Sequence, residues 1–144
     1  MAAMEAVATN DFEEITGVWE ASVRATHAFL TEADIAAYKA LFPACLGGVD
    51  LFCFREQGRI TGFIGIASGK VEMLFIHPAH RGKGLGQALM RFAMETHGVN
   101  LVDVNEENTS AAGFYFRLGF EVTGRSAEDG LGKPHPLLHL KLRP

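Results

Sequence analysis

Apolar residues in the first third of the chain recur at intervals of three and four positions, which is the period of an amphipathic helix. The first series consists of Phe12, Ile15, Trp19 and Val23. It predicts a helix that ends near Thr26, and Asn10 with Glu13 forms a capping-box pattern at its start. An amphipathic helix packed on a core is therefore expected near the N-terminus.

A second amphipathic segment follows directly. Thr31, with Asp34 three residues later, provides its N-terminal cap. Its apolar side carries Ile35, Tyr38 and Leu41. Because proline disfavours helical geometry in the residue before it, this helix is predicted to end before Pro43.

The pattern then changes to short runs of β-branched and aromatic residues bounded by glycine, proline and asparagine, which is typical of strands. The predicted strands are Leu51–Arg55, Arg59–Ala67, Val71–Ile76, Leu101–Asn105, Phe120–Thr123 and Leu137–Leu142. The turn Glu56–Gly58 joins the first two into a hairpin, and the segment Glu5–Ala8 can form a leading strand.

Two further helices are predicted among these strands. One carries Leu85, Leu89, Phe92 and Ala93 on a single face and ends near His97 and Gly98. The other opens at Asn108 and stops at Gly119. The resulting order of helices and strands predicts a mixed α/β fold around one sheet, in a single domain over residues 1–144.

Composition narrows the class of protein. Of the 144 residues, 48% are apolar and 21% are charged, which is typical of a folded domain and not of a disordered segment. Lys and Arg total 13 against 17 Asp and Glu, and the net charge of −4 argues against nucleic acid or an anionic membrane as a partner. Any anionic ligand must therefore be bound by local features of the chain.

Cysteines and terminal sequence point to a cytoplasmic protein. Cys45 and Cys53 form no CxxC motif, so reduced thiols are expected. The N-terminal segment is acidic and has no long apolar run, which argues against a signal peptide. No stretch approaches the roughly 18 apolar residues of a membrane span.

The segment Arg81–Gly86, with the sequence RGKGLG, lies between the predicted strand Val71–Ile76 and the next helix. A strand, a glycine turn and a helix N-terminus together form an anion site, because free backbone N–H groups and the positive end of the helix dipole meet there. A dinucleotide fingerprint is excluded, because Leu89 stands where glycine or alanine is required. A Walker A loop is excluded, because Lys83 is followed by Gly84 and not by serine or threonine.

Arg81, Gly84 and Gly86 fill the pattern Arg/Gln-x-x-Gly-x-Gly/Ala of the pyrophosphate loop in the GNAT family of acyl-CoA N-acyltransferases, which this sequence resembles. The second family signature is matched over Asn108–Phe120, and the resemblance covers Phe12–Leu142. The tail GLGKPHPLLHL is similar to that of a bacterial subgroup, the YjaB-like proteins. The resemblance implies the GNAT fold, a central mixed β-sheet flanked by about four helices, with acetyl-CoA as cosubstrate and no metal.

The resemblance also assigns residues to the cofactor. The pyrophosphate is expected on backbone N–H groups of the glycine loop, and the pantetheine arm on the main chain of the preceding strand, where an N–H polarises the thioester carbonyl. The cofactor-binding residues so implied are Leu74, Phe75, Ile76, Arg81, Gly82, Lys83, Gly84, Leu85, Gly86, Gln87 and Asn108. Asn108 is also a good helix N-cap, and the two roles can coexist.

Tyr115 matches the family tyrosine that protonates the departing CoA thiolate. A phenol has an ordinary pKa of about 10, so it is protonated at neutral pH and suits this role. The alternative is a core aromatic, since Phe114, Phe116 and Phe120 are its neighbours.

The base that removes the proton of the acceptor amine has three candidates. Asp103 occupies the strand position of the base glutamate in the ribosomal-protein acetyltransferase branch, but it is one carbon shorter, so a water relay is one option. Glu72 lies on the same strand face as Leu74. His27 lies in the turn between the first two helices and has a side chain suited to proton transfer; its alternative role is a turn residue stabilised by the helix dipole.

The acceptor site is expected to be walled by Trp19, Ser22, Thr26, His27 and Phe29. Trp19 equally suits a plain core position. His77, His80 and His97 lack metal-ligand spacing and are expected at the surface, and His135 and His139 flank the closing strand.

These residues predict an acetyl-CoA-dependent N-acetyltransferase that transfers an acetyl group to a primary amine by direct attack in a ternary complex. The acceptor is expected to be a small-molecule or peptide amine, and the protein a monomer or homodimer with no nucleic-acid or membrane partner. The competing hypothesis is a non-catalytic CoA-binding regulatory module.

Overall fold

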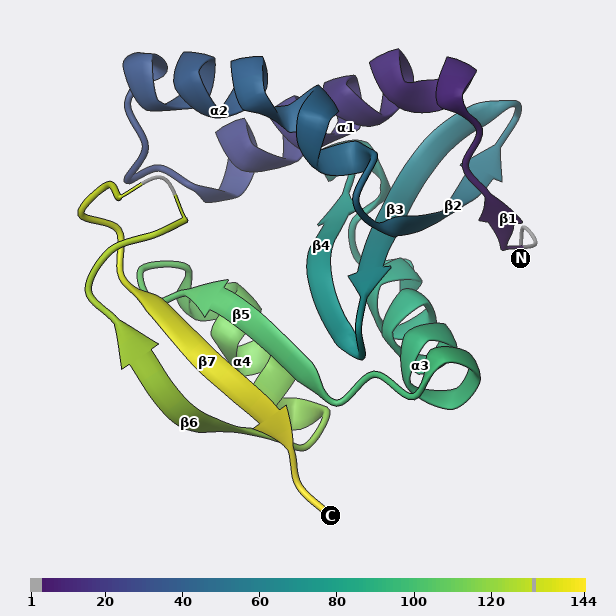
Figure 1. Ribbon diagram of the computed structural model, residues 1–144. Helices are drawn as coiled ribbons and strands as arrows, with labels where there is room; N and C mark the ends of the chain where they lie inside the picture. The colour runs from purple at the N-terminus through teal and green to yellow at the C-terminus, as the bar shows by residue number, and fades with distance from the viewer. Residues whose placement is uncertain (1–3, 131) are drawn as a thin grey trace. The chain divides into compact units, whose positions relative to one another are not determined.

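The computed structural model describes residues 4–130 and 132–144. Its helices and strands are β1 (Glu5–Ala6), η1 (Thr9–Asp11), α1 (Phe12–Thr26), α2 (Glu32–Leu46), β2 (Asp50–Glu56), β3 (Arg59–Ala67), β4 (Lys70–Ile76), η2 (Pro78–His80), α3 (Leu85–His97), β5 (Leu101–Asn105), α4 (Thr109–Arg117), β6 (Phe120–Ser126) and β7 (Leu137–Leu142). The mixed α/β class is confirmed, and the predicted order of elements is observed (Figure 1). The chain divides into two compact units, Met1–Val99 and Asn100–Pro144. A single domain over residues 1–144 stays a prediction.

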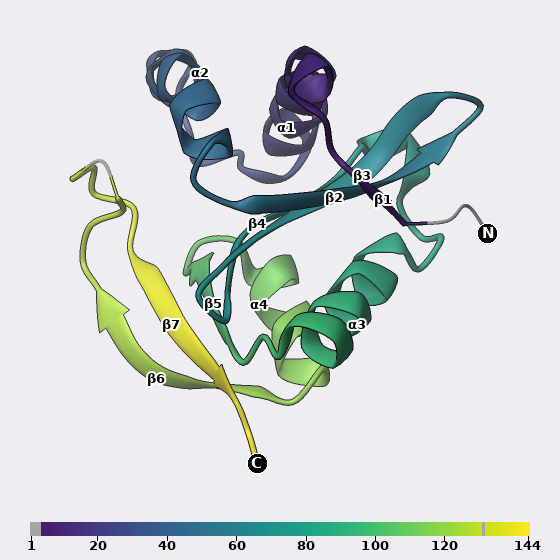
Figure 2. The ribbon, with the colours of Figure 1, turned by 45° about the vertical axis from the view of Figure 1, so that its right-hand side comes forward.

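The N-terminal unit is built on the antiparallel strands β1, β2, β3 and β4, which pair in chain order. Helices α1 and α2 cover one face of this sheet, and α3 covers the other (Figure 2). Because both faces are covered, β3 is buried continuously from Ile60 to Ile66 and does not alternate between apolar and polar residues. The hairpin turn contains only Gln57 and Gly58, with φ of 52° and 78°, so β2 extends through Glu56.

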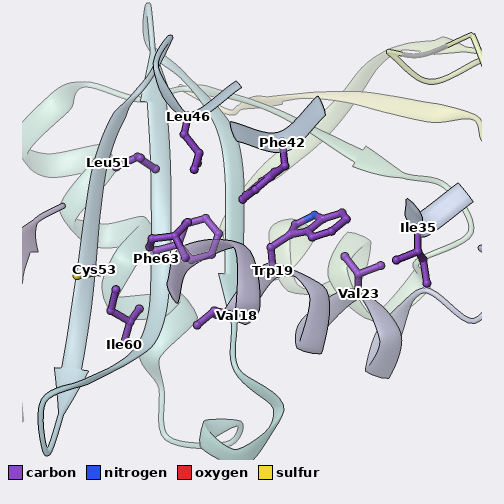
Figure 3. Packing of buried hydrophobic residues seen from close by; sticks show 11 residues of the cluster. Val18, Trp19, Val23, Ile35, Phe42, Leu46, Leu51, Cys53, Ile60 and Phe63 are labelled. Atoms are coloured by element: carbon purple, nitrogen blue, oxygen red, sulfur yellow. The ribbon is translucent and has the colours of Figure 1, made fainter. Parts of the chain in front are cut away.

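The core of this unit lies between α1, α2 and the sheet (Figure 3). The indole of Trp19 stacks on Phe42 with ring centroids 5.0 Å apart, and Phe42 meets the edge of Phe63 at 6.4 Å. Ile15 and Val23 are also buried, as their helical spacing predicted. The apolar face of α1 therefore packs against α2, which in turn packs against β3.

Pro43 lies inside α2, so the prediction that this helix ends before it is wrong. Thr31 and Asp34 form the predicted capping box, and the helix continues to Leu46. Pro43 is exposed, whereas Phe42 and Leu46 are buried in the core. The carbonyl that loses its helical partner at Pro43 can be hydrated, while the packing of Phe42 and Leu46 holds the last turn.

The start of α1 also differs from the prediction. The turn η1 precedes the helix, and Asp11, not Asn10, is its N-cap residue. The Asp11 carboxylate accepts the Ala8 N–H at 3.0 Å and pairs with the Arg55 guanidinium at 2.8 Å. The Asp11 side chain therefore closes the turn η1 and binds Arg55 of β2, and it makes no capping hydrogen bond to α1.

The C-terminal unit consists of the antiparallel strands β5, β7 and β6, in that order, with α4 against β5 and β6. Val102, Leu140 and Phe120 are buried on one face, and Tyr115 of α4 contacts Phe120 there. Since side chains alternate along strands, Asp103 and its register partner His139 lie on the opposite face. This unit thus has an apolar face covered by α4 and a polar face.

Cys45 and Cys53 are free thiols, exposed and buried respectively. Burial raises the pKa of the Cys53 thiol to about 11, which keeps it protonated. In the part of the chain that the structure describes, no helix has the length and apolar character needed to cross a membrane.

Candidate active site

The glycine loop leads from β4 through η2 into α3. Gly82 and Gly84 both adopt left-handed backbone geometry, with φ of 76° and 77°, which residues with a Cβ rarely adopt. Gly84 is the N-cap residue of α3, and the first helical bond runs from the Ala88 N–H to the Gly84 carbonyl at 3.1 Å. The loop therefore turns sharply just before α3, and no side chain of Gly84 covers the first turn of the helix.

The N-terminus of α3 differs from those of α2 and α4. The Thr31 hydroxyl caps α2 and the Asn108 amide caps α4, whereas Gly84 has no side chain to cap α3. The backbone N–H groups of Leu85, Gly86 and Gln87 have no acceptor inside the helix, because the carbonyls four residues before them lie outside it. With the helix dipole, they form a site that suits an anion such as pyrophosphate.

Side chains supply less charge to this loop than its composition implied. Arg81 is exposed. The Lys83 ammonium lies 3.3 Å from the Glu56 carboxylate and donates to His80 Nδ1 at 3.0 Å. Glu56 therefore offsets part of the charge that Lys83 was expected to bring, which leaves backbone N–H groups as the main anion-binding feature.

A cavity of about 810 Å³ in the N-terminal unit lies between α1, the hairpin turn and η2. Glu13, Glu14 and Glu56 contribute carboxylates to its lining, and Arg59 contributes one guanidinium. This excess of negative charge disfavours a pyrophosphate inside it, so the loop before α3 is the better anion site.

Strand β4 carries Leu74, Phe75, Ile76 and the base candidate Glu72. Phe75 packs against the core beneath α1, with its ring 5.7 Å from that of Phe63. Ile76 lies on the opposite face, in line with Leu89 of α3 beside Gly62. Alternation places Leu74 on this α3 face. Glu72 lies at a register shift, where Gly65 pairs with Met73 but Ile66 with Val71, so alternation does not assign its face; its side chain is exposed.

His27 follows α1 and is half-buried. The Thr26 hydroxyl donates its single proton to the Ser22 carbonyl at 2.8 Å, so His27 Nδ1, 2.7 Å from that hydroxyl, must be the donor between them. The other ring nitrogen then holds the lone pair. Burial, with a smaller contribution from Arg81, lowers the pKa of His27 to about 4, which makes it a neutral and weak base at neutral pH.

The remaining predicted acceptor residues differ in exposure. Trp19 and Ser22 are only 6% and 5% exposed, so both are core residues of α1 with little surface to offer a ligand. Phe29 is half-buried, and its ring lies 5.2 Å from that of His27. Thr26, His27 and Phe29 are the members of this set with accessible surface.

Asn108 and Tyr115 belong to α4. Asn108 Oδ1 accepts the Ala111 N–H at 3.2 Å, which confirms the cap and leaves the NH₂ group of the side chain able to donate. Tyr115 is 6% exposed and its ring contacts Phe114 and Phe120 at 5.1 and 6.0 Å. Burial raises the pKa of the Tyr115 hydroxyl above 10.0, so it stays protonated at neutral pH.

Asp103 is not an isolated carboxylate. Its Oδ1 lies 2.7 Å from His139 Nδ1, and His139 Nε2 lies 2.6 Å from Ser126 Oγ. The three residues come from β5, β7 and β6. Sequence reasoning placed Asp103 correctly on its strand but missed His139 and Ser126 as its companions, because the register of three strands brings them together and no local motif marks it.

The other histidines have structural partners. His77 Nδ1 accepts the Ala79 N–H at 3.1 Å, His80 contacts Lys83 and Glu56, and the His97 ring lies 5.0 Å from Phe52. These three histidines were expected at the surface, and the structure shows them half-buried. Within residues 4–130 and 132–144, no three His, Cys, Asp or Glu side chains gather into a metal site.

Comparison with known proteins assigns the family. Residues 48–122 match the model of the acetyltransferase (GNAT) domain. The chain is 40% identical over 129 residues to the peptidyl-lysine N-acetyltransferase YjaB of Salmonella typhimurium, with 89% of each chain covered. The solution structure of apo-form YjaB from Escherichia coli is 35% identical, with a TM-score of 0.89 over 98% of this chain and 97% of that one.

A more distant structure shows the same fold. YncA of Salmonella typhimurium, solved with its cofactor acetyl-CoA, is 22% identical with a TM-score of 0.69, covering 99% of this chain and 94% of that one. The similarity to YjaB matches the bacterial subgroup that the tail sequence indicated. The chain belongs to the GNAT family of acetyl-CoA-dependent N-acetyltransferases.

Proposed function

We propose that this protein transfers the acetyl group of acetyl-CoA to the side-chain amine of a peptidyl lysine. The observation that carries the proposal is the N-terminus of α3, which no side chain caps at Gly84 and whose backbone N–H groups suit the pyrophosphate of CoA. The lysine acceptor follows the activity named for the YjaB relative, which is 40% identical. The net charge of −4 favours a cationic acceptor.

The proposed cofactor contacts are mainly backbone groups. Amides of the segment 82–87 bind the pyrophosphate, and Arg81 adds charge from an exposed position. The main chain of Leu74–Ile76 pairs with the pantetheine arm, and the Asn108 NH₂ group donates to it. A backbone N–H of β4 polarises the thioester carbonyl and stabilises the developing oxyanion.

Tyr115 is proposed as the acid that protonates the CoA thiolate. Burial raises the pKa of its hydroxyl, so at neutral pH the phenol is protonated and has a proton to give. The ring of Tyr115 packs edge-on against that of Phe120, with centroids 6.0 Å apart. A phenylalanine would make the same ring contacts, so the acid role depends on the hydroxyl and on the match of Tyr115 to the family tyrosine.

Asp103 is proposed as the carboxylate that assists removal of the proton from the acceptor amine. His27, with a pKa of about 4, is too weakly basic to deprotonate an ammonium efficiently. Glu72 is exposed at a register shift of β4, and among the described residues it has no neighbour that would orient it in the way His139 orients Asp103. Neither cysteine lies in the two signatures, so the amine attacks the thioester directly in a ternary complex.

The test is a transfer assay with purified protein, acetyl-CoA and a peptide that has a blocked N-terminus and one lysine. Mass spectrometry of the peptide and release of free CoA should both show transfer. The same peptide with the lysine already acetylated is the control for hydrolysis of acetyl-CoA. Tight CoA binding without transfer to this peptide or to a panel of small amines would instead favour the non-catalytic module.

A further inference from the structure

The turn that joins β5 to α4 carries Asn108 at its end. Residues 105–108 form this turn, which is closed by a hydrogen bond of 3.0 Å from the Asn108 N–H to the Asn105 carbonyl. Asn108 then caps α4 through Oδ1, and in the proposed function its NH₂ group donates to the pantetheine arm. The conformation of the two central residues, Glu106 and Glu107, therefore determines where the Asn108 side chain lies.

Both central residues of this turn bind residues far along the chain, in β6 and in the connection from β6 to β7. The Glu106 N–H donates to the Pro136 carbonyl at 2.9 Å, and the Glu106 carboxylate pairs with Arg125 of β6. The Glu107 carboxylate lies 3.2 Å from His135 Nδ1, across 28 positions of sequence. All of these residues belong to the C-terminal unit. Tertiary contacts within one unit therefore hold both central residues of the turn.

Of the two side-chain contacts to this turn, the one from His135 is better shielded from water. The side chains of Arg125 and Glu106 are 52% and 41% exposed, and exposed ion pairs contribute little to stability. The His135 side chain is only 12% exposed. A carboxylate only accepts hydrogen bonds, so His135 Nδ1 carries the proton that it donates to Glu107. The largely buried imidazole is therefore the side chain that restricts the turn most.

The backbone on both sides of His135 is restricted as well. Pro134 and Pro136 flank it, and each proline fixes its own φ and favours an extended conformation in the residue before it. The His135 N–H also donates to the Lys133 carbonyl at 2.7 Å. Because this segment has few alternative conformations, it presents the imidazole to Glu107 at a small cost in conformational entropy.

We infer that His135 is a positioning residue for the cofactor contact made by Asn108. The inference rests on the proposed function and adds the residue that fixes the direction of the Asn108 NH₂ group. His135 acts through Glu107, by restricting the turn that ends at Asn108. The cap of α4 does not depend on it, because the hydrogen bond between Asn108 and the Ala111 N–H is local to the helix. Loss of the imidazole should therefore weaken CoA binding and leave α4 in place.

The test measures the affinity of the full-length protein for CoA by calorimetric titration. His135→Ala should raise the dissociation constant by about threefold to tenfold, and His135→Asn, which keeps an N–H donor near the place of Nδ1, should recover most of the loss. Glu107→Ala should weaken binding to a similar extent. Glu121→Ala removes another exposed carboxylate of the same unit and is the matched control, with an affinity within about twofold of wild type.

A double-mutant cycle separates positioning from a general structural role. Asn108→Ser keeps an oxygen that can cap α4 and removes the NH₂ group. In this background His135→Ala should cause no further loss of CoA affinity, because the group that it positions is absent. In the wild-type background it should raise the KM for acetyl-CoA and change kcat by less than about twofold.

Three results would overturn the role of His135 and leave the proposed function in place. They are an unchanged CoA affinity in His135→Ala, an equal loss from His135→Ala in both backgrounds, and a loss in His135→Asn as large as that in His135→Ala. A wild-type protein that neither binds CoA nor acetylates an amine would overturn the proposed function itself.

Discussion

The two units differ in the kind of polar group that each presents. The N-terminal unit presents backbone N–H groups at the start of α3, where Gly84 leaves the helix uncapped. The C-terminal unit presents side-chain atoms, namely the Tyr115 phenol and the row of Asp103, His139 and Ser126. In the proposed function, the backbone groups of the N-terminal unit hold the anionic cofactor, and the Tyr115 phenol of the C-terminal unit gives a proton to the leaving thiolate.

This difference determines which substitutions each unit tolerates. A backbone site depends on φ and ψ, so side-chain changes around it should have small effects while a change at its glycines should have a large one. A site built from side chains is sensitive to side-chain substitutions, because the loss of one oxygen atom removes the reacting group and leaves the backbone unchanged. The following predictions would sharpen or break this contrast.

The largest effect is expected at Tyr115. Tyr115→Phe keeps the ring that packs on Phe120 and removes only the hydroxyl, so kcat should fall by about a hundredfold or more while the dissociation constant of CoA stays unchanged. Steady-state kinetics and calorimetric titration with CoA measure the two quantities. Tyr38→Phe is the matched control and should retain full activity. Undiminished turnover in Tyr115→Phe would leave Tyr115 as a core aromatic.

Low pH should lower the stability of the N-terminal unit by protonating His27. Its pKa is about 4 in the fold, against an ordinary value of 6.5, so the stability it contributes is complete above pH 6.5 and is lost as the pH falls toward 4. At pH 5 the free energy of unfolding should be about 2 kcal/mol lower than at pH 8 from this group alone. Urea unfolding at both values should show a smaller difference in His27→Gln, and equal differences in both proteins would contradict the assignment.

The backbone site is tested with two glycines at opposite ends of α3. Gly84 and Gly98 have φ of 77° and 62°, and a Cβ at either would meet no atom within 4 Å. Alanine at each should cost about 1 to 2 kcal/mol of stability through the same backbone strain. Only Gly84→Ala should weaken CoA binding, by about tenfold. Equal affinity in the two variants would remove the start of α3 from the cofactor site.

The smallest effect is expected at Glu56, which offsets the charge of Lys83 in an exposed contact of 3.3 Å. Glu56→Gln should tighten CoA binding by about twofold to threefold at low salt, because exposed ion pairs are weak. Glu13→Gln removes the same charge from the lining of the same cavity without freeing Lys83, and it should change the affinity less. A much larger gain at Glu56 would show that side-chain charge, and not the backbone, dominates the anion site.

Local patterns predicted most of the architecture. The spacing of Ile15, Trp19 and Val23 identified the buried face of α1, and the bounds of β5 and the cap at Asn108 were correct. These features depend on neighbours within a few residues, so a single segment contains the information. The two GNAT signatures likewise identified the loop before α3 and Tyr115 as candidate site residues.

Errors arose where distant contacts override local preference. Pro43 stays inside α2 because Phe42 and Leu46 pack in the core, and α1 begins after Asp11, whose carboxylate pairs with Arg55 of β2 and does not cap the helix. The fold buries both Trp19 and Ser22, as the alternative core role of Trp19 anticipated, and their place in the wall of the acceptor site stays a prediction. Propensity contributes about 1 kcal/mol at such positions, and packing of a large aromatic contributes more.

The sequence by itself determined the family, the fold class, the glycine loop and the acid candidate, because these are encoded in short, ordered motifs. Only the tertiary structure decided which polar side chains form hydrogen bonds and ion pairs with these residues. Lys83 is paired with Glu56 across 27 positions of sequence, and Asp103 with His139 across 36. Hydrogen bonds act over about 3 Å in space, so strand register and chain reversal, which no local pattern specifies, determine which polar groups meet.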